Sequence, residues 1–178
     1  KVARTKSTVM IYGETGTGKE LVARAIHNGG SRKNKRYLSQ NCAAIPENLL
    51  ESILFGTTRG SFTGAENRPG LFEIASGGTL FLDEINSMDL AVQAKILKAI
   101  EEQKIRRIGG TEDILIDVRI IAATNEDPLL CMQRGSLRED LYYRLKVVQL
   151  NIPPLRNRKE DIRPLTEYYI NFYNTVMG

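Results

Sequence analysis

A glycine-rich segment near the start of the chain has the residue types and spacing that bind phosphate groups. Residues 13–19 read Gly-Glu-Thr-Gly-Thr-Gly-Lys and fit the P-loop spacing G-x-x-x-x-G-K. Glycines let the backbone curl until its N–H groups face an anion, and the helix that begins there adds its positive end. A lysine supplies a point charge for the β- and γ-phosphates. The predicted nucleotide-binding residues are Gly13, Glu14, Thr15, Gly16, Thr17, Gly18, Lys19 and Glu20.

The residue after the lysine departs from the general pattern. Serine or threonine usually stands there and holds Mg²⁺ through its hydroxyl group. This chain has Glu20 instead, so the pattern assigns no direct magnesium ligand to that position. A glycine-rich turn without a ligand would use the same glycines, but the order of strand, loop, lysine and helix favours a phosphate site.

Two adjacent acids follow an apolar run, in the pattern called Walker B. Leu80-Phe81-Leu82 precedes Asp83 and Glu84. Two neighbouring carboxylates at a strand end are costly to hold close unless a cation or solvent compensates their charge. Asp83 is therefore predicted to hold Mg²⁺ through water, and Glu84 to orient and polarise an attacking water. An ordinary strand end is the alternative, and the preceding P-loop favours the catalytic interpretation.

The elements that would position these residues alternate between strands and helices. Apolar runs predict strands at 9–12, 37–41, 79–82, 119–123 and 147–150. Helical spacing predicts helices at 20–27, 46–55, 90–103 and 161–177, and a hairpin at 105–118 that turns at Gly109-Gly110. This alternation indicates an α/β fold whose central sheet is mostly parallel and flanked by helices. The P-loop, Asp83-Glu84 and Thr124-Asn125 all follow strands, at the sheet edge where ligands bind.

A long loop is expected between Gly56 and Pro69. Loops of this length are uncommon inside compact domains and are often functional. Phe62 stands between Gly60 and Gly64, and the two glycines predict a mobile tip that presents the aromatic ring. The alternative is that Phe62 folds back onto its own domain.

Composition limits the class of protein. The chain has 178 residues, 42% of them hydrophobic, and a formal net charge of +4, which does not by itself argue for nucleic-acid binding. Cys42 and Cys131 show no metal-ligand spacing, so a reduced cytosolic chain explains them most simply. No apolar run approaches the ~18 residues of a membrane span, and no membrane partner is expected. Both ends look cut, which suggests a fragment of a longer protein.

The P-loop with Glu20, together with Gly60-Ser61-Phe62-Thr63-Gly64-Ala65, resembles the sigma-54 interaction domain of bacterial AAA+ transcription activators, the enhancer-binding proteins. That family carries GETGTGKE at the P-loop and GAFTGA in a loop before Walker B, so the one difference is Ser61 in place of alanine. The resemblance runs through nearly the whole chain. Further matching segments lie at 41–44, 77–85, 122–125, 138–145 and 153–156.

The resemblance implies a fold, an activity and partners. Residues 1–154 would form an AAA+ α/β ATPase core of the P-loop NTPase class, with a sigma-54-contacting loop near 56–69, and 155–178 the start of a truncated helical lid. The core would hydrolyse ATP with Mg²⁺ to remodel sigma-54 RNA polymerase and activate transcription in the bacterial cytoplasm. The partner contacts would come from Gly60, Ser61, Phe62, Thr63, Gly64 and Ala65. DNA binding would come from a domain missing from this sequence.

The resemblance also implies roles for four polar residues. Asn125 matches the sensor I position, and Asn41 matches the residue that holds the Walker B glutamate at rest. Arg138 and Arg144 match paired arginines that reach into a neighbouring subunit of a ring, which is a hexamer in this family. Local alternatives remain open. Asn41 could be a strand-end turn residue, and the arginines could form surface ion pairs with Glu139 or Asp140.

Other functions compete with this interpretation. One is an AAA+ nucleotide-dependent regulatory module with a partner other than sigma-54, and another is an AAA+ machine such as a chelatase or helicase. Glu20 and the 60–65 segment argue against the latter. The chain departs from the family pattern at Ile53, Thr57, Pro128 and Leu137, none of which is a predicted phosphate-contacting position.

Overall fold

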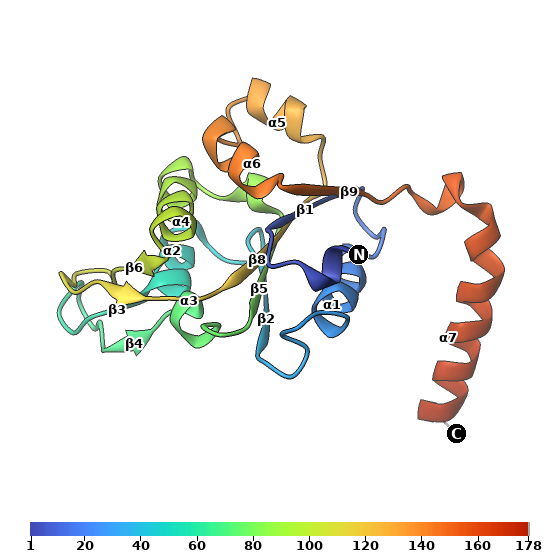
Figure 1. The fold of residues 1–178 in the computed structure, drawn as a ribbon, viewed down its shortest axis with the longest axis horizontal. Helices are drawn as coiled ribbons and strands as arrows, with labels where there is room; N and C mark the ends of the chain where they lie inside the picture. The colour runs from blue at the N-terminus through green and yellow to red at the C-terminus, as the bar shows by residue number, and fades with distance from the viewer. Residues whose placement is uncertain (178) are drawn as a thin grey trace.

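A parallel sheet forms the centre of the computed structural model, which describes residues 1–177. Its strands are β1 (Val9–Tyr12), β2 (Tyr37–Asn41), β5 (Thr79–Asp83), β8 (Arg119–Thr124) and β9 (Val148–Asn151). They lie in the order β2-β5-β8-β1-β9, and every neighbouring pair is parallel (Figure 1). All five predicted strands are therefore present, and the mostly parallel sheet is confirmed.

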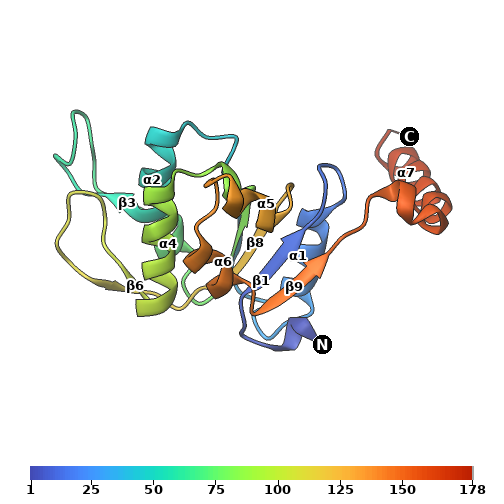
Figure 2. The ribbon, with the colours of Figure 1, turned by 90° about the horizontal axis from the view of Figure 1, so that it is seen from above.

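Helices cover both faces of this sheet. The described helices, of which α7 alone stands apart from the sheet, are α1 (Lys19–Asn28), α2 (Glu47–Phe55), α3 (Leu71–Ile74), α4 (Leu90–Glu102), α5 (Pro128–Gln133), α6 (Glu139–Leu145) and α7 (Ile162–Met177). Short 3₁₀ turns are η1 (Val2–Arg4), η2 (Ile85–Ser87), η3 (Leu155–Asn157) and η4 (Lys159–Asp161). Figure 2 shows α1 and α4 on opposite sides of the strands.

Side-chain alternation along the strands builds two cores. In β5, Leu80 and Leu82 join the core beneath α2, α4 and α6, while Phe81 joins the core beneath α1. Each of these strand residues is fully buried. Because both faces of the sheet are covered, the strands read as continuous apolar runs rather than as alternating ones.

Strand register brings the predicted polar residues to one edge. Asn41 pairs with Asp83, and Tyr12 pairs with Thr124, at the carboxyl ends of their strands. The N–H of Gly13 donates to the carbonyl of Thr124 at 3.3 Å, so the P-loop begins beside the end of β8. The common edge expected for these groups is therefore confirmed.

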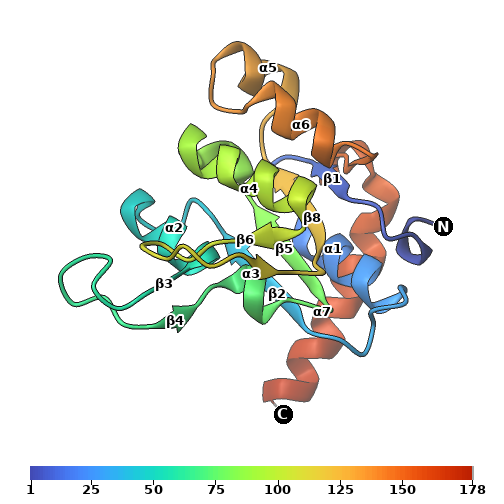
Figure 3. The ribbon, with the colours of Figure 1, turned by 60° about the vertical axis from the view of Figure 1, so that its left-hand side comes forward.

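Two small antiparallel hairpins project on the same side of the molecule (Figure 3). The first joins β3 (Gly56–Thr57) to β4 (Arg68–Pro69) and encloses the long loop. The second joins β6 (Lys104–Ile105) to β7 (Ile114–Leu115), as predicted for 105–118. The N–H of Ile108 donates to Gly56 and the N–H of Thr58 donates to Ile108, each at 3.0 Å, so the hairpins are joined at their bases.

Three helices lie outside the sequence predictions, and one predicted face is only partly correct. The unpredicted helices are α3, α5 and α6, which have four, six and seven residues, too few to give a clear apolar period. The predicted face of the 46–55 helix included Leu49, but that side chain is 47% exposed. Leu50 and Leu54, one turn apart, face the core with Phe55.

The last helix stands apart from the sheet (Figures 1 and 2). Residues 155–161 form the two turns η3 and η4 that connect β9 to α7. The boundary expected between 154 and 155 stays a prediction, and Gly178 of the expected lid segment lies outside the described residues. No described helix combines the length and the apolar character that crossing a membrane requires.

Candidate functional site

The P-loop backbone depends on its glycines. Gly16 and Gly18 have φ values of +82° and +91°, in the left-handed region that favours glycine. Gly13 is required for a steric reason instead. A Cβ atom there would lie 2.8 Å from the Thr17 hydroxyl and 2.9 Å from the Ile152 carbonyl. The loop therefore curls tightly before α1 begins at Lys19.

Lys19 lies inside the curl of this loop and is only 6% exposed. Its Nζ donates to the carbonyls of Gly13 at 2.9 Å and Glu14 at 3.3 Å. The Thr17 hydroxyl donates to the same Glu14 carbonyl at 2.8 Å. Carbonyl dipoles do not neutralise an ammonium ion, and a buried charge is costly without a countercharge. The loop is therefore suited to an anion.

The two predicted acids lie half-buried at the end of β5. Burial raises the pKa of the Asp83 carboxyl group, while the nearby Lys19 ammonium lowers it. The Asp83 Oδ1 accepts the N–H of Glu84 at 3.0 Å. Glu84 has φ 55° and ψ 50°, a left-handed conformation that costs a non-glycine residue about 1–2 kcal/mol. Strain of this kind is concentrated at functional sites.

These donors fit the way proteins hold Mg²⁺. Magnesium is usually bound through one or two carboxylates, with phosphates and waters as its other ligands. The structure provides the Asp83 carboxylate near Lys19, with Oδ1 engaged by a main-chain N–H. Across residues 1–177, no group of three or more metal-ligating side chains forms a cage. The Glu20 carboxylate forms an ion pair with Arg24 at 3.2 Å.

Asn41 lies beside Asp83 but bonds to its own turn. Its Oδ1 accepts the N–H groups of Ala43 at 2.9 Å and Ala44 at 3.1 Å. No hydrogen bond joins it to Glu84 within the described residues. The strand-end turn, which was the alternative for this residue, is therefore present, and its role toward Glu84 stays a prediction.

Asn86 is a residue that the sequence interpretation missed. It lies in η2, two residues after Glu84, and its Oδ1 accepts the Thr124 hydroxyl at 2.9 Å. Its Nδ2 contacts Oδ1 of Asn125 at 3.4 Å. Asn86 thus joins the end of β5 to the end of β8, where the predicted sensor residue lies. Its position after Asp83-Glu84 was the only signal available.

Two arginines from the connection to α7 reach the P-loop. Arg156 donates to both carboxylate oxygens of Glu14, at 2.8 Å and 2.5 Å, and these bonds lower the pKa of Glu14. Arg158 donates to the Thr17 carbonyl at 2.8 Å. Between the P-loop and α7 lies a cavity of about 800 Å³. The sequence interpretation used Arg156 only as part of a matching segment and gave neither arginine a role.

The predicted trans arginines lie at opposite ends of α6. Arg138 precedes the helix and donates to both carboxylate oxygens of Asp140, at 3.0 Å and 2.6 Å. Arg144 lies in the last turn, exposed, and its side chain forms no hydrogen bond or ion pair with the described residues. The local ion pair that was the alternative therefore exists for Arg138 but not for Arg144.

The long loop ends in a tight turn that exposes Phe62. Gly60 and Gly64 have φ values of +83° and +81°. The N–H of Gly60 donates to the Ala65 carbonyl at 3.3 Å, and the N–H of Ala65 donates to Phe62 at 3.0 Å. Phe62 is 51% exposed, which favours a presented ring over one folded back onto the domain.

The neighbouring hairpin supports this turn from below. Gly109 approaches so closely that a Cβ atom there would lie 2.5 Å from Cβ of Ser61 and 2.9 Å from the Thr58 hydroxyl. Arg107 donates to both carboxylate oxygens of Glu73, at 2.8 Å and 2.7 Å. The hairpin predicted to turn at Gly109-Gly110 therefore packs against the loop tip.

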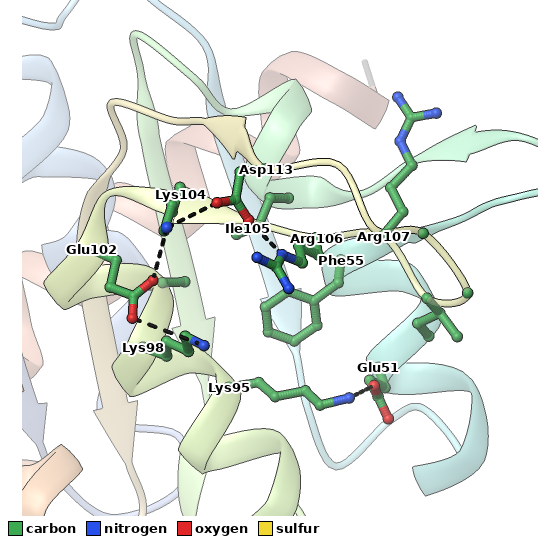
Figure 4. Close-up of a pocket in the computed structure, with 14 residues that line it drawn as sticks. Glu51, Phe55, Lys95, Lys98, Glu102, Lys104, Ile105, Arg106, Arg107 and Asp113 are labelled. Carbon is green, nitrogen blue, oxygen red and sulfur yellow. Dashed lines mark hydrogen bonds and ion pairs between the residues drawn. The ribbon is translucent and has the colours of Figure 1, made fainter.

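A cavity of about 350 Å³ lies under the same hairpin, around Phe55 (Figure 4). Lys104 and Arg106 converge on Asp113. The remaining cations in the view pair as well, in the ion pairs Lys95–Glu51, Lys98–Glu102 and Arg107–Glu73. Because its cations already form ion pairs with carboxylates, this cavity has less to offer an anion than the P-loop, where Lys19 Nζ is hydrogen-bonded only to main-chain carbonyls.

Comparison with known proteins identifies the family. The family model described as the sigma-54 interaction domain matches residues 1–151. The transcriptional activator RocR of Bacillus subtilis is 60% identical over 174 residues, which cover 98% of this chain and 38% of RocR. The regulatory protein AtoC of Escherichia coli is 51% identical over 176 residues, again 98% of this chain and 38% of the relative. The chain thus spans about two fifths of these relatives.

Solved structures agree with the fold. NtrX from Brucella abortus in complex with ADP has a TM-score of 0.89 at 41% identity, over 97% of this chain and 38% of NtrX. The same protein in complex with ATP has a TM-score of 0.87 at 42% identity, over 96% of this chain and 38% of NtrX. The phosphate-binding loop, the paired acids and the glycine-flanked loop tip lie on an AAA+ P-loop NTPase fold, and the chain belongs to the sigma-54 interaction domain family of bacterial transcription activators.

Proposed function

We propose that this chain hydrolyses ATP and uses the energy to remodel sigma-54 RNA polymerase, which activates transcription. The observation that carries the proposal is the meeting of Lys19, Asp83 and Glu84 at one sheet edge. The nucleotide complexes of the related NtrX support ATP as the ligand. The family membership supports sigma-54 as the partner.

Each predicted residue has a chemical task in this proposal. Lys19 and the N–H groups of residues 13–20 bind the phosphates, and Mg²⁺, held by Asp83 through water, neutralises phosphate charge. Glu84 orients and polarises the attacking water. Asn125 reports the presence of the γ-phosphate, and Asn41 holds Glu84 at rest.

The ring is part of the same proposal. Arg138 and Arg144 act on the nucleotide of the next subunit, where an arginine stabilises charge on the transferred phosphoryl group. Each subunit is then active only beside another, and a head-to-tail interface that closes gives a hexamer. The exposed, unpaired Arg144 supports its availability to a neighbour.

The loop tip is the proposed output. Residues 60–65 contact sigma-54, and the glycines at both ends of the turn let it change height with the nucleotide state. The support comes from the exposure of Phe62 and from the hairpin that holds the loop base. Ser61 in place of the family's alanine is a small change beside Gly109.

Co-sedimentation with purified sigma-54 tests the proposal. The full-length protein is mixed with sigma-54, with or without ADP and a metal-fluoride mimic of the γ-phosphate. We expect sigma-54 to be retained only with the mimic, because the phosphate site controls the loop. If rings that hydrolyse ATP retain no sigma-54 in either condition, the protein is a nucleotide-dependent regulator with another partner.

A further inference from the structure

We propose that Gln93 is a positioning residue, which ties the segment after the catalytic glutamate to the segment that offers arginine to the next subunit. The inference rests on the proposed ring with trans arginines. Within one subunit, Gln93 would connect two places. One is the site where that subunit hydrolyses ATP, and the other is α6, which carries the arginine for the neighbouring subunit. Glu84 lies at one end of this connection, and α6 with Arg144 lies at the other.

Gln93 uses its whole amide group on main-chain atoms of two segments: the one just before α4, and the one before α6, more than 40 residues away. It lies in α4 and is fully buried. Its Nε2 donates to the carbonyl of Met88 at 3.0 Å and to the carbonyl of Ser136 at 2.9 Å. Its Oε1 accepts the N–H of Arg138 at 2.9 Å. Both amide hydrogens and the oxygen are thus engaged.

The first of these partners is rigidly connected to the hydrolysis site. Met88 follows η2, the turn that begins one residue after Glu84. Within this turn the N–H of Ser87 donates to Glu84 at 3.0 Å, and the N–H of Met88 donates to Ile85 at 3.3 Å. A change in the backbone of Glu84 therefore moves a carbonyl to which Gln93 is bonded.

The other two partners fix the start of α6. Gln93 holds the main chain of Arg138, while Asp140 holds its guanidinium group through two bonds. Leu141 and Leu145 bury the helix against the core that contains α4. Because α6 is short and packed, the position of its first residue sets the position of Arg144 in its last turn.

The surroundings of Gln93 show that an amide is needed there for its bonds rather than for its bulk. Its neighbours on α4 that face the core are apolar, among them Val92 and Ile96. Burying an amide in such surroundings is costly unless it is fully hydrogen-bonded. A leucine or methionine would fill similar space at no such cost, but it would remove the hydrogen-bond partner of three main-chain groups, one buried and two part-buried.

Mixed rings of the full-length protein separate positioning from general stability. A Glu84→Gln subunit lacks its own hydrolysis but still offers arginine, whereas an Arg144→Ala subunit hydrolyses only with a neighbour's arginine. Mixing the two should restore ATPase activity at the interfaces they share. Gln93→Met is then added to one kind of subunit at a time, and the restored rate is measured.

We expect Gln93→Met to lower the restored rate by about tenfold or more when the arginine-offering subunit carries it, since a ~1 Å misplacement can cost about 100-fold. In the Arg144→Ala subunit, the same change should alter the rate by no more than about twofold. Gln93→Glu serves as a second variant, because its carboxylate can accept the Arg138 N–H but cannot donate to Met88 and Ser136. It should show the same asymmetry.

Gln103→Met is the control, because Gln103 follows the last residue of α4 and its amide bonds only to the Ile100 carbonyl, three residues earlier, at 3.0 Å. It should leave both mixtures unchanged. The role of Gln93 would be overturned if Gln93→Met lowered the restored ATPase rate equally in the two kinds of subunit, or in neither. The proposal of a ring with trans arginines would be unaffected by that result. If the unmodified mixture shows no restored activity, the trans arginines fail, and the inference fails with them.

Discussion

At the scale of single residues, the backbone conformation of Glu84 sets the direction in which its side chain leaves the end of β5. The left-handed conformation at φ 55° turns the chain sharply after β5, immediately before η2. The strain of about 1–2 kcal/mol is tolerated because the strand before it and the turn after it are both hydrogen-bonded. The side chain therefore leaves the sheet at an angle that an extended backbone would not give.

Replacing Glu84 with glutamine should separate binding from turnover. The variant keeps the shape of the side chain but cannot polarise water, so we expect the ATPase rate to fall about 100-fold or more. Nucleotide affinity, measured by fluorescence titration of the full-length protein, should stay near that of the unmodified protein. Glu101→Gln, on the exposed face of α4, is the matched control. Unchanged turnover in Glu84→Gln would remove the proposed base.

Replacing Thr63 with alanine should separate turnover from output. Thr63 is exposed at the loop tip and far from Lys19 in the chain, so the ATPase rate should change by no more than about twofold. Retention of sigma-54 with the phosphate mimic should be lost. Thr5→Ala, at another exposed threonine, should retain sigma-54 normally. Normal retention by Thr63→Ala would assign the contact to other residues.

The sequence singled out the candidate phosphate-site residues because the chemistry expected of them is local. The P-loop from Gly13 to Lys19 and the pair Asp83-Glu84 each carry their function in a few consecutive positions. Asn86 and Gln93 could not be found in the same way. Thr124, which bonds to Asn86, and Ser136 and Arg138, which bond to Gln93, lie 38 to 45 residues away, so these roles depend on how the strands and helices pack.

At the scale of elements, the two hairpins behave as one unit because Ile108 and Gly109 lie against the loop base. The N–H and carbonyl of Ile108 both bond to it, and Gly109 packs on Ser61. The sequence predicted the hairpin at 105–118, but for residues 56–69 it predicted only a long loop, so it missed the pairing of β3 with β4. It could not give the strand lengths, because two-residue strands have no period.

Replacing Gly109 with alanine should disturb the loop in two ways, by straining the backbone and by a steric clash with Ser61. The φ of +75° and a Cβ atom 2.5 Å from Ser61 both oppose the change. Gly135→Ala is the matched control, since its φ is +74° and nothing lies within 4 Å of the added atom. We expect Gly109→Ala to lower the free energy of unfolding by about 1–3 kcal/mol more than the control. It should also weaken sigma-54 retention.

Denaturant unfolding and co-sedimentation measure these two effects separately. If Gly109→Ala and Gly135→Ala lose the same stability and retain the same sigma-54, the close approach of the hairpin has no consequence for the loop.

At the scale of the whole molecule, a cavity of about 800 Å³ lies between the P-loop with α1 and the final helix α7. The P-loop forms one wall, and Arg158, Ile162 and Tyr169 belong to the other. The sequence predicted that 161–177 is helical, and the helix begins at Ile162. It could not predict which side of the sheet the helix faces, because a helical period says nothing about the partner of an apolar side.

The two arginines beside this cavity should differ in importance. The Arg156–Glu14 pair is exposed, 65% and 48% for the two side chains, and solvent screening leaves such pairs little net stabilising effect. Arg158 is 25% exposed and bonds to the Thr17 carbonyl, and its Nε is buried without a partner in the described structure. We expect Arg158→Met to weaken nucleotide binding about tenfold, and Arg156→Met by no more than about threefold.

Equilibrium titration of both variants with a fluorescent nucleotide measures the difference. Equal losses would mean that the connection to α7 acts as a unit, and a larger loss for Arg156→Met would reverse the assignment of the two side chains.

The left-handed backbone at Glu84 also restricts how this position can evolve. Glycine, asparagine and aspartate tolerate that conformation best, but none of them places a carboxylate at the reach of glutamate. Glycine and aspartate are each one nucleotide change away from a glutamate codon. Under the role proposed for Glu84, a single mutation to either residue is therefore expected to remove turnover without disturbing the fold. Homologous proteins that have lost hydrolysis but still bind nucleotide should therefore have glycine or aspartate at this position more often than alanine or a larger residue.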